Sequence, residues 1–236
     1  MGQPTAVVAG AGSGIGRGCA LRLAGEGHHV ICVGRSADKL TETVARIEAA
    51  DGSADAFAGD VRDWARMEEL AARVAPRGLD LLVNSAGGQF FAPAAQLTEN
   101  GWRSVVEVNL FGSFNLCRQL YPALKARRGS VVLVVAGLWR KAAPGLVHSA
   151  AARAGVVQMM RTLALEWAGE GIRVNALCPG LTDTNALIER YRGLVESVPL
   201  GRIGEIDEVV DALLYLARAA YVTGEVLTID GGLHLV

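Results

Sequence analysis

A glycine-rich turn between an apolar run and a helical segment constrains the fold more than any other feature of the sequence. The short apolar run 5–9 continues directly into Gly10-Ala11-Gly12-Ser13-Gly14-Ile15-Gly16, and residues 15–26 then show helical periodicity. Such a turn needs glycine because its backbone angles exclude a Cβ and because a pyrophosphate must approach bare amides at the helix N-terminus. The strand–turn–helix context therefore predicts a dinucleotide-binding unit. The alternative is a glycine-rich turn that binds nothing.

The rest of the chain repeats this alternation of strand and helix. We expect strands at 5–9, 29–33, 54–58, 79–83, 130–135, 173–177 and 226–229, and helices near 15–26, 37–50, 63–75, 98–127, 149–168 and 205–217. The strand segments are almost continuously apolar, which is typical of parallel strands covered on both faces. The pattern predicts an α/β fold with a doubly wound parallel sheet of about seven strands, flanked by helices on both faces (Rossmann type). Without a linker or repeat, residues 1–236 are expected to form a single domain.

Composition narrows the possible partners. The formal net charge of -1 gives no reason to expect nucleic acid or an anionic membrane surface. The four cysteines form no CxxC pair and have no histidines at ligand spacing, so we expect reduced buried thiols and no metal site. The N-terminus has no basic region typical of a signal peptide, and no uncharged stretch is apolar enough for a membrane span. A cytoplasmic location follows as an expectation.

Several motifs along the chain resemble those of the short-chain dehydrogenase/reductase family, in the family's order. Gly10-x-x-x-Gly14-Ile15-Gly16 is similar to the TGxxxGIG fingerprint, with Ala9 in place of the threonine. Further matches are Gly59-Asp60-Val61, Asn84-Ser85-Ala86-Gly87, Pro179-Gly180 with Thr184, Pro199 to Arg202, and Thr223 to Glu225 with Asp230 to Gly232. The resemblance extends over nearly the whole chain and implies binding of a nicotinamide dinucleotide.

The resemblance also implies which residues contact that cofactor. Gly10, Ser13, Gly14, Ile15 and Gly16 would cradle the pyrophosphate. The remaining contacts would come from Asp60 and Val61 at the adenine, from Asn84, Ala86 and Gly87 after the fourth strand, from Arg153 at the nicotinamide ribose, and from Pro179, Gly180 and Thr184 near the carboxamide.

The end of the second predicted strand bears on which dinucleotide is bound. An acidic residue there would bind the ribose diol and repel a 2′-phosphate, but the strand ends in Gly34 followed by Arg35. Arg35 offers a planar cationic fork suited to phosphate, and Arg17 is a second, weaker candidate. We therefore favour NADP(H) over NAD(H). The alternative is that Arg35 is a solvated surface residue.

The family's catalytic residues are aligned through Ala154-Gly155-Val156, which resembles the segment after the family's lysine. This alignment predicts Arg153 in place of the lysine, Ser149 in place of the tyrosine and Ala136 in place of the serine, while Asn109 matches the family's asparagine. A serine hydroxyl is too weak an acid for the work of a phenol, and an arginine does not deprotonate to relay protons.

Other side chains could supply the missing chemistry. His148 precedes Ser149 and could act as an acid or base, although a histidine at a helix N-terminus facing solvent or a subunit contact is the simpler interpretation. Arg140 and Lys141 could supply an electrophile or be solvated loop charges, and Tyr191 could enter from a lid or serve lid packing. Trp139 and Phe90 would line the pocket or fill the core.

Two classes of function follow. The first is an NADP(H)-dependent oxidoreductase acting on a small carbonyl or alcohol with weak or non-standard acid–base chemistry. The second is a catalytically silent dinucleotide-binding protein, acting as a sensor, scaffold or partner subunit; a non-redox reaction is a third possibility that no residue singles out. Besides a small-molecule substrate, the resemblance implies a homodimer or homotetramer, with the long helices near 98–127 and 149–168 at the interface.

Overall fold

The computed structural model describes residues 2–184 and 192–236. In this part of the chain one seven-stranded sheet has the order β3-β2-β1-β4-β5-β6-β7, and every neighbouring pair is parallel. The strands are β1 (Thr5–Ala9), β2 (His29–Gly34), β3 (Ser53–Ala58), β4 (Leu81–Asn84), β5 (Ser130–Val134), β6 (Arg173–Pro179) and β7 (Val226–Ile229). The prediction of a doubly wound parallel sheet is confirmed. Because the strand order reverses between β1 and β4, a crevice is expected at their carboxyl ends.

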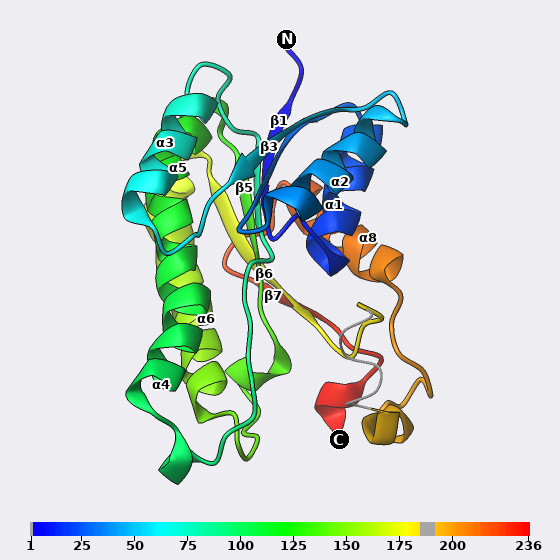
Figure 1. The fold of residues 1–236 in the computed structure, drawn as a ribbon. Coiled ribbons are helices and arrows are strands. Elements are labelled where there is room, and N and C mark those ends of the chain that lie inside the picture. The colour runs from blue at the N-terminus through cyan, green and yellow to red at the C-terminus, as the bar shows by residue number, and fades with distance from the viewer. Residues whose placement is uncertain (1, 185–191) are drawn as a thin grey trace.

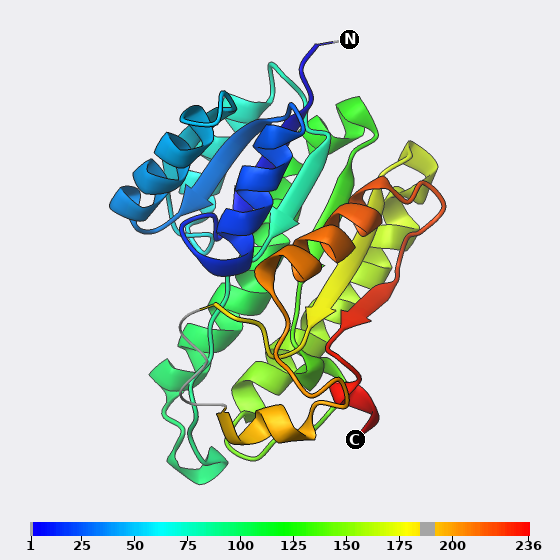
Figure 2. The same cartoon turned by 90° about the vertical axis from the view of Figure 1, so that its right-hand side faces the viewer.

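Helices cover both faces of this sheet (Figure 1). On one side lie α3 (Trp64–Val74), α5 (Gly112–Arg127) and α6 (Val147–Trp167), and on the other α1 (Gly14–Gly25), α2 (Ala37–Glu48) and α8 (Ile206–Arg218). The short helix α4 (Glu99–Val106) precedes α5, and 3-10 turns are formed by Ala94–Gln96, Gly137–Trp139, Ala168–Glu170, Arg192–Ser197 and Leu233–Leu235. Figure 2 shows the α1, α2 and α8 face from the front. No helix among the described residues is long and apolar enough to cross a membrane.

The apolar strands explain why both faces must be covered. All five residues of β1 are buried. Val7 and Ala9 belong to the core under α3, α5 and α6, whereas Ala6 and Val8 belong to the core under α1, α2 and α8. Because successive side chains of a strand point to opposite faces, an uninterrupted apolar strand is stable only between two layers of helices.

The structure corrects one predicted element, the single helix over 98–127. It is divided into α4 and α5 by a π-helical turn, Glu107–Phe111. Asn109 lies in this turn, and its Nδ2 donates to the carbonyl oxygen of Val105 at 2.7 Å. Ser113 Oγ donates to the Asn109 carbonyl at 2.5 Å. Side-chain donors thus replace backbone donors at the widened turn, an arrangement that is frequent at functional sites.

A second difference concerns the helix predicted at 149–168. This helix, α6, begins at Val147, so His148 lies inside its first turn. Residues 148 and 149 are both buried there, which brings the first turn of α6 against the loop that follows β4.

The four cysteines are buried and unpaired. Burial raises the pKa of Cys19, Cys32 and Cys117 to about 12. No cluster of three or more histidine, cysteine or carboxylate side chains in residues 2–184 and 192–236 is arranged to hold a metal ion.

Candidate active site

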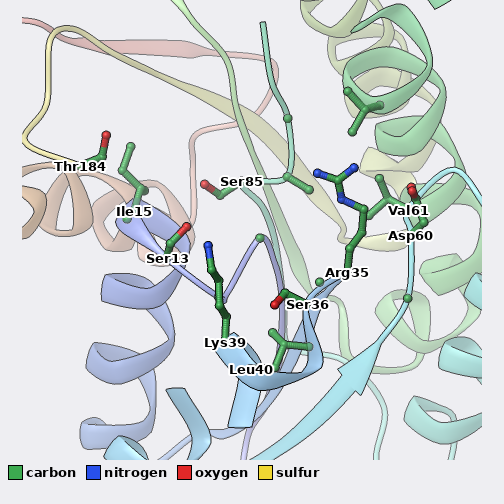
Figure 3. Close-up of a pocket in the computed structure, with 18 residues that line it drawn as sticks. Ser13, Ile15, Arg35, Ser36, Lys39, Leu40, Asp60, Val61, Ser85 and Thr184 are labelled. Atoms are coloured by element: carbon green, nitrogen blue, oxygen red, sulfur yellow. The ribbon is translucent and has the colours of Figure 1, made fainter. Parts of the chain in front are cut away.

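A cavity of about 640 Å³ opens at the carboxyl ends of β1 and β4, where the strand order reverses (Figure 3). The residues predicted from the sequence that line it are Gly10, Ser13, Gly14, Ile15, Arg35, Asp60, Val61, Ala86, Gly87 and Thr184. Sequence reasoning did not assign Gly12, Gly34, Ser36, Lys39, Leu40, Gly59, Ser85 and Val108, which also line it. The structure therefore brings together residues from the carboxyl ends of β1, β2, β3 and β4, from the start of α2, from the π-helical turn and from the segment after β6.

The turn between β1 and α1 is shaped by glycines that admit no side chain. Gly10 has a φ of +83°, and a Cβ there would lie 2.8 Å from the carbonyl carbon of Ser85. A Cβ on Gly16 would lie 2.2 Å from the carbonyl oxygen of Gly10. Ser13 precedes α1 in an extended conformation and its side chain makes no capping hydrogen bond. The first amides of α1 are thus left for an anion, which fits the pyrophosphate of a dinucleotide.

The wall of the cavity after β2 carries two cationic side chains. Arg35, Ser36 and Lys39 line the wall after β2, and Figure 3 shows the Lys39 amine between Ser13 and Arg35. Arg17 does not share this role, because its guanidinium donates to both carboxylate oxygens of Glu42 at 3.1 and 2.9 Å. The weaker candidate suggested by the sequence is therefore committed to an ion pair.

Asp60 lies on the same wall as Arg35 (Figure 3). Its carboxylate accepts hydrogen bonds from the side chain and the backbone amide of Arg62, the nearest at 2.7 Å. These hydrogen bonds, followed in effect by the charges of Arg62 and Arg35, lower the pKa of Asp60 despite partial burial. Asp60 is therefore ionised at neutral pH and can accept a hydrogen bond from an adenine amino group.

Asn84 and Asn109 do not line the cavity but hold the loop that does. Asn84 Oδ1 accepts the amide of Ala86 at 3.0 Å, and its Nδ2 donates to Ser113 Oγ at 2.9 Å. Asn109 Nδ2 donates to the carbonyl oxygen of Gly88 at 2.8 Å. Both asparagines are almost completely buried, so they are positioning residues for the segment 85–88.

The end of β6 lies opposite the glycine turn. Thr184 faces Gly14, where a Cβ would come within 3.3 Å of its Cγ2. Gly180 lies against β7, since a Cβ there would be 2.6 Å from the Cα of Asp230. Of the residues predicted at and after the end of β6, Thr184 lines the cavity, whereas Pro179 and Gly180 do not.

Ser149 and Arg153 stand one helical turn apart on α6 and each meets a different loop. Ser149 Oγ donates to Gln89 Oε1 at 2.8 Å. Arg153 Nη1 donates to the carbonyl oxygen of Val134 at 2.8 Å, two residues before Ala136. A Cβ on Gly87 would lie 2.5 Å from Asn109 Oδ1 and 2.8 Å from Arg153 Nη2, so Arg153 and Asn109 converge on the loop after β4.

The guanidinium of Arg153 has unused hydrogen-bonding capacity. Its Nε is buried without a partner among the described residues, and burial lowers the pKa of Arg153 to about 10. A buried cation with an orphaned donor favours the binding of an acceptor such as a ribose hydroxyl. The assignment of Ala136, Ser149 and Arg153 to the family's serine, tyrosine and lysine stays a prediction.

The side chains predicted as possible substitutes for the family's acid lie in different surroundings. His148 is fully buried, its ring lies 4.7 Å from that of Phe90, and neither ring nitrogen has a partner among the described residues. The interpretation of His148 as a solvent-facing residue is therefore wrong. Trp139 packs against the core, with the Arg140 guanidinium 5.5 Å from its ring centre.

Two further candidates are less informative about the reaction. The amine of Lys141 contacts the carbonyl oxygen of Val236 and is exposed. Tyr191 lies outside the described residues.

Gln89 and Lys39 are the residues of interest that the sequence reasoning missed. Gln89 comes five residues after Asn84, but its contact with Ser149 spans 60 residues, and no local pattern encodes it. Lys39 lies in the first turn of α2, four residues after Arg35, so a search for further cations close to Arg35 in the sequence could have found it.

Comparison with known proteins gives consistent matches over the whole chain. A family model described as enoyl-(acyl carrier protein) reductase matches residues 10–234. The chain is 37% identical to a probable 2,4-dienoyl-CoA reductase of Bacillus subtilis, covering 98% of this chain and 97% of that protein. It is 39% identical to a 3-oxoacyl-[acyl-carrier-protein] reductase of Thermotoga maritima, covering 96% of each. A crystal structure of a candidate NAD(P)-dependent gluconate 5-dehydrogenase from Beutenbergia cavernae, with NADP at low occupancy, superposes with a TM-score of 0.93 at 36% identity, covering 99% of this chain and 97% of that one.

Proposed function

The chain belongs to the short-chain dehydrogenase/reductase family of oxidoreductases, and from that premise we propose that it is an NADPH-dependent reductase of a carbon–carbon double bond conjugated to a thioester. The observation that carries this proposal is the Ser149–Gln89 pair at the position where the family resemblance leads one to expect a phenol. The activities for which the Bacillus relative and the matching family model are named support a conjugated thioester as the substrate.

The preference for NADP(H) is supported by the cationic wall after β2. Arg35 and Lys39 are exposed side chains that line the cavity together with Ser36. Asp38, the acid of the same turn, is not among the lining residues. A 2′-phosphate would therefore meet two cations and a hydroxyl, which is favourable for a charged hydrogen-bond acceptor.

When bound, the dihydronicotinamide supplies a hydride. The protein's task is then to stabilise the electrons that move to the substrate oxygen. In ketone reduction these electrons form an alkoxide, a strong base that must be protonated at oxygen by a nearby acid. In reduction of a conjugated thioester they are spread over an enolate, which hydrogen-bond donors and a nearby cation can stabilise before water protonates carbon.

The side chains on α6 suit the reduction of a conjugated thioester. Because Ser149 donates its hydroxyl hydrogen to Gln89 Oε1, the amide Nε2 of Gln89 remains as a donor at an exposed position. Arg153, fixed to the carbonyl of Val134, supplies a positive charge and can hold ribose hydroxyls. We assign Gln89 to the substrate oxygen and Arg153 to the cofactor ribose.

The experiment measures NADPH and NADH binding by calorimetry and then NADPH oxidation with 2-enoyl-CoA, 2,4-dienoyl-CoA, 3-oxoacyl-CoA and small ketones. We expect tighter binding of NADPH and turnover confined to the conjugated thioesters. Gln89→Ala should lower kcat by about 100- to 1,000-fold, the loss typical of one oxyanion donor. Gln96→Ala, which removes an exposed amide from the turn after the same loop, is the matched control and should have no effect.

Three outcomes would contradict the proposal. Turnover of ketones alone would mean that the protein carries out the carbonyl and alcohol chemistry expected from the family. Turnover only after Ala136→Ser, Ser149→Tyr and Arg153→Lys are combined would show that the natural protein binds the dinucleotide without using it. Absence of binding to either dinucleotide would exclude both an oxidoreductase and a catalytically silent dinucleotide-binding protein.

A homodimer or homotetramer is part of the same proposal. Phe111 at the end of the π-helical turn and Phe114 in α5 are 41% and 40% exposed. Large exposed aromatic side chains on neighbouring turns support an interface with another copy of the chain. Sedimentation measurements would test this.

A further inference from the structure

The cationic end of the cavity also contains a carboxylate, which would normally oppose phosphate binding. Asp60 lines the same wall as Arg35, and its side chain is 24% exposed (Figure 3). The charge of Arg35 acts on this carboxylate, so the two groups are electrostatically coupled. A free carboxylate here would attract Arg35 and repel a phosphate on the adenosine ribose.

Arg62 prevents this by engaging Asp60 from outside the cavity. Its Nη2 donates to Oδ2 at 2.7 Å, and its Nε donates to Oδ1 at 3.0 Å, which gives a bidentate pair. The Arg62 amide adds a third contact to Oδ1 at 3.0 Å. Arg62 itself is not among the lining residues, so the charge of Asp60 is balanced without any loss of space for the ligand.

Arg17, unlike Arg35, is held in an ion pair among the described residues. Arg17 begins on α1 near the same cavity, but Glu42 takes its guanidinium in a bidentate pair. No ion pair involving Arg35 or Lys39 is found in residues 2–184 and 192–236. Glu107, the other carboxylate whose field reaches Arg62, pairs with Arg103 at 3.4 Å. Glu42, Asp60 and Glu107 are thus each paired with an arginine other than Arg35, and Arg35 is left available.

We propose, on the premise that the site prefers NADP(H) as proposed above, that Arg62 is a specificity-determining residue that acts through Asp60. It neutralises the carboxylate and so keeps Arg35 free for the 2′-phosphate. Arg62 touches neither the phosphate nor the nicotinamide. Its removal therefore weakens NADPH binding more than NADH binding.

The test measures dissociation constants for NADPH and NADH by calorimetry with the full chain. In Arg62→Gln the preference for NADPH over NADH should fall about fivefold, the size expected for one uncompensated charge acting through a partly solvated site. Arg62→Lys retains the charge and should keep the preference within about twofold. Arg22→Gln removes one arginine from an exposed pair with Asp211 at the far end of α1, and it should leave the preference unchanged.

A double variant separates this role from a purely structural one. Adding Asp60→Asn to Arg62→Gln removes the uncompensated charge, so the preference should return even though both dinucleotides bind more weakly. Failure of the preference to return would mean that Arg62 only braces the loop before α3. Asp60→Asn alone should keep or raise the preference, and a lower value would contradict the proposal even if Arg62→Gln does not fold.

The wild-type measurement distinguishes failure here from failure of the proposed function. If the wild type binds neither dinucleotide, or binds both equally, the premise itself is wrong. If the wild type prefers NADPH and Arg62→Gln retains the full preference, the role given to Arg62 is wrong and the cofactor assignment stands.

Discussion

The proposed phosphate cradle, which is the glycine turn after β1, and the proposed reaction face, which is Ser149 and Arg153 on α6, differ in what gives each its shape. In the cradle, glycines leave room for close backbone contacts, such as the approach of Gly10 to Ser85. On α6, the shape depends on side chains that reach over long sequence separations, such as Ser149 to Gln89 and Arg153 to Val134. A site made of backbone tolerates few substitutions, whereas a site made of side chains can change its chemistry without a change of fold. The family's dinucleotide can thus be retained while the reaction differs.

Gly16→Ala tests the site that is made of backbone, and we expect it to have the largest effect. A Cβ at Gly16 would lie 2.2 Å from the carbonyl oxygen of Gly10, so the turn must shift. We expect the dissociation constant for NADPH to rise at least about 100-fold and the free energy of unfolding to fall by about 2–4 kcal/mol. Calorimetry and urea unfolding measure the two effects.

Gly25→Ala is the matched control for that variant. Gly25 ends the same helix and has no neighbouring atom within 4 Å of an added Cβ. It should change the free energy of unfolding by less than about 1 kcal/mol and leave binding unaltered. Similar losses in both variants would mean that helix α1, and not the close approach of the turn, is what the cradle requires.

The same contrast explains how much the sequence could predict. The sheet, its helical layers and the glycine turn follow from short-range patterns, such as the apolar run of β1 and the glycines directly after it. The break in the predicted helix over 98–127 could not be foreseen, because it arises when the Asn109 side chain takes the carbonyl of Val105. The burial of His148 could not be foreseen either, since it depends on Phe90 from another loop.

Arg153→Met should show a smaller effect in which stability and function change in opposite directions. The guanidinium is buried with an orphaned Nε, and burial lowers its pKa to about 10, so the folded protein keeps this charge at a cost. An apolar side chain of similar length should raise the free energy of unfolding by about 1 kcal/mol. The affinity for NADPH should fall about tenfold because a ribose contact is lost.

Thermal unfolding with and without NADPH would measure both the change in stability and the change in affinity for NADPH. The variant should melt higher than the wild type alone, and should gain less from the added nucleotide. If it melts lower, the hydrogen bond from Arg153 to Val134 outweighs the burial of the charge, and the reaction face is as dependent on fixed structure as the cradle.

His148→Leu should have the smallest effect, and it tests whether the reaction face contains a hidden acid. The imidazole is fully buried against Phe90, and neither nitrogen has a partner among the described residues, so an apolar side chain should be tolerated. We expect the free energy of unfolding to change by less than about 1 kcal/mol and kcat for a conjugated thioester to stay within about twofold. A fall in kcat of tenfold or more, with folding and NADPH binding intact, would make His148 the proton donor. The reaction face would then keep a dedicated acid, as in the family, and only the identity of that residue would have changed.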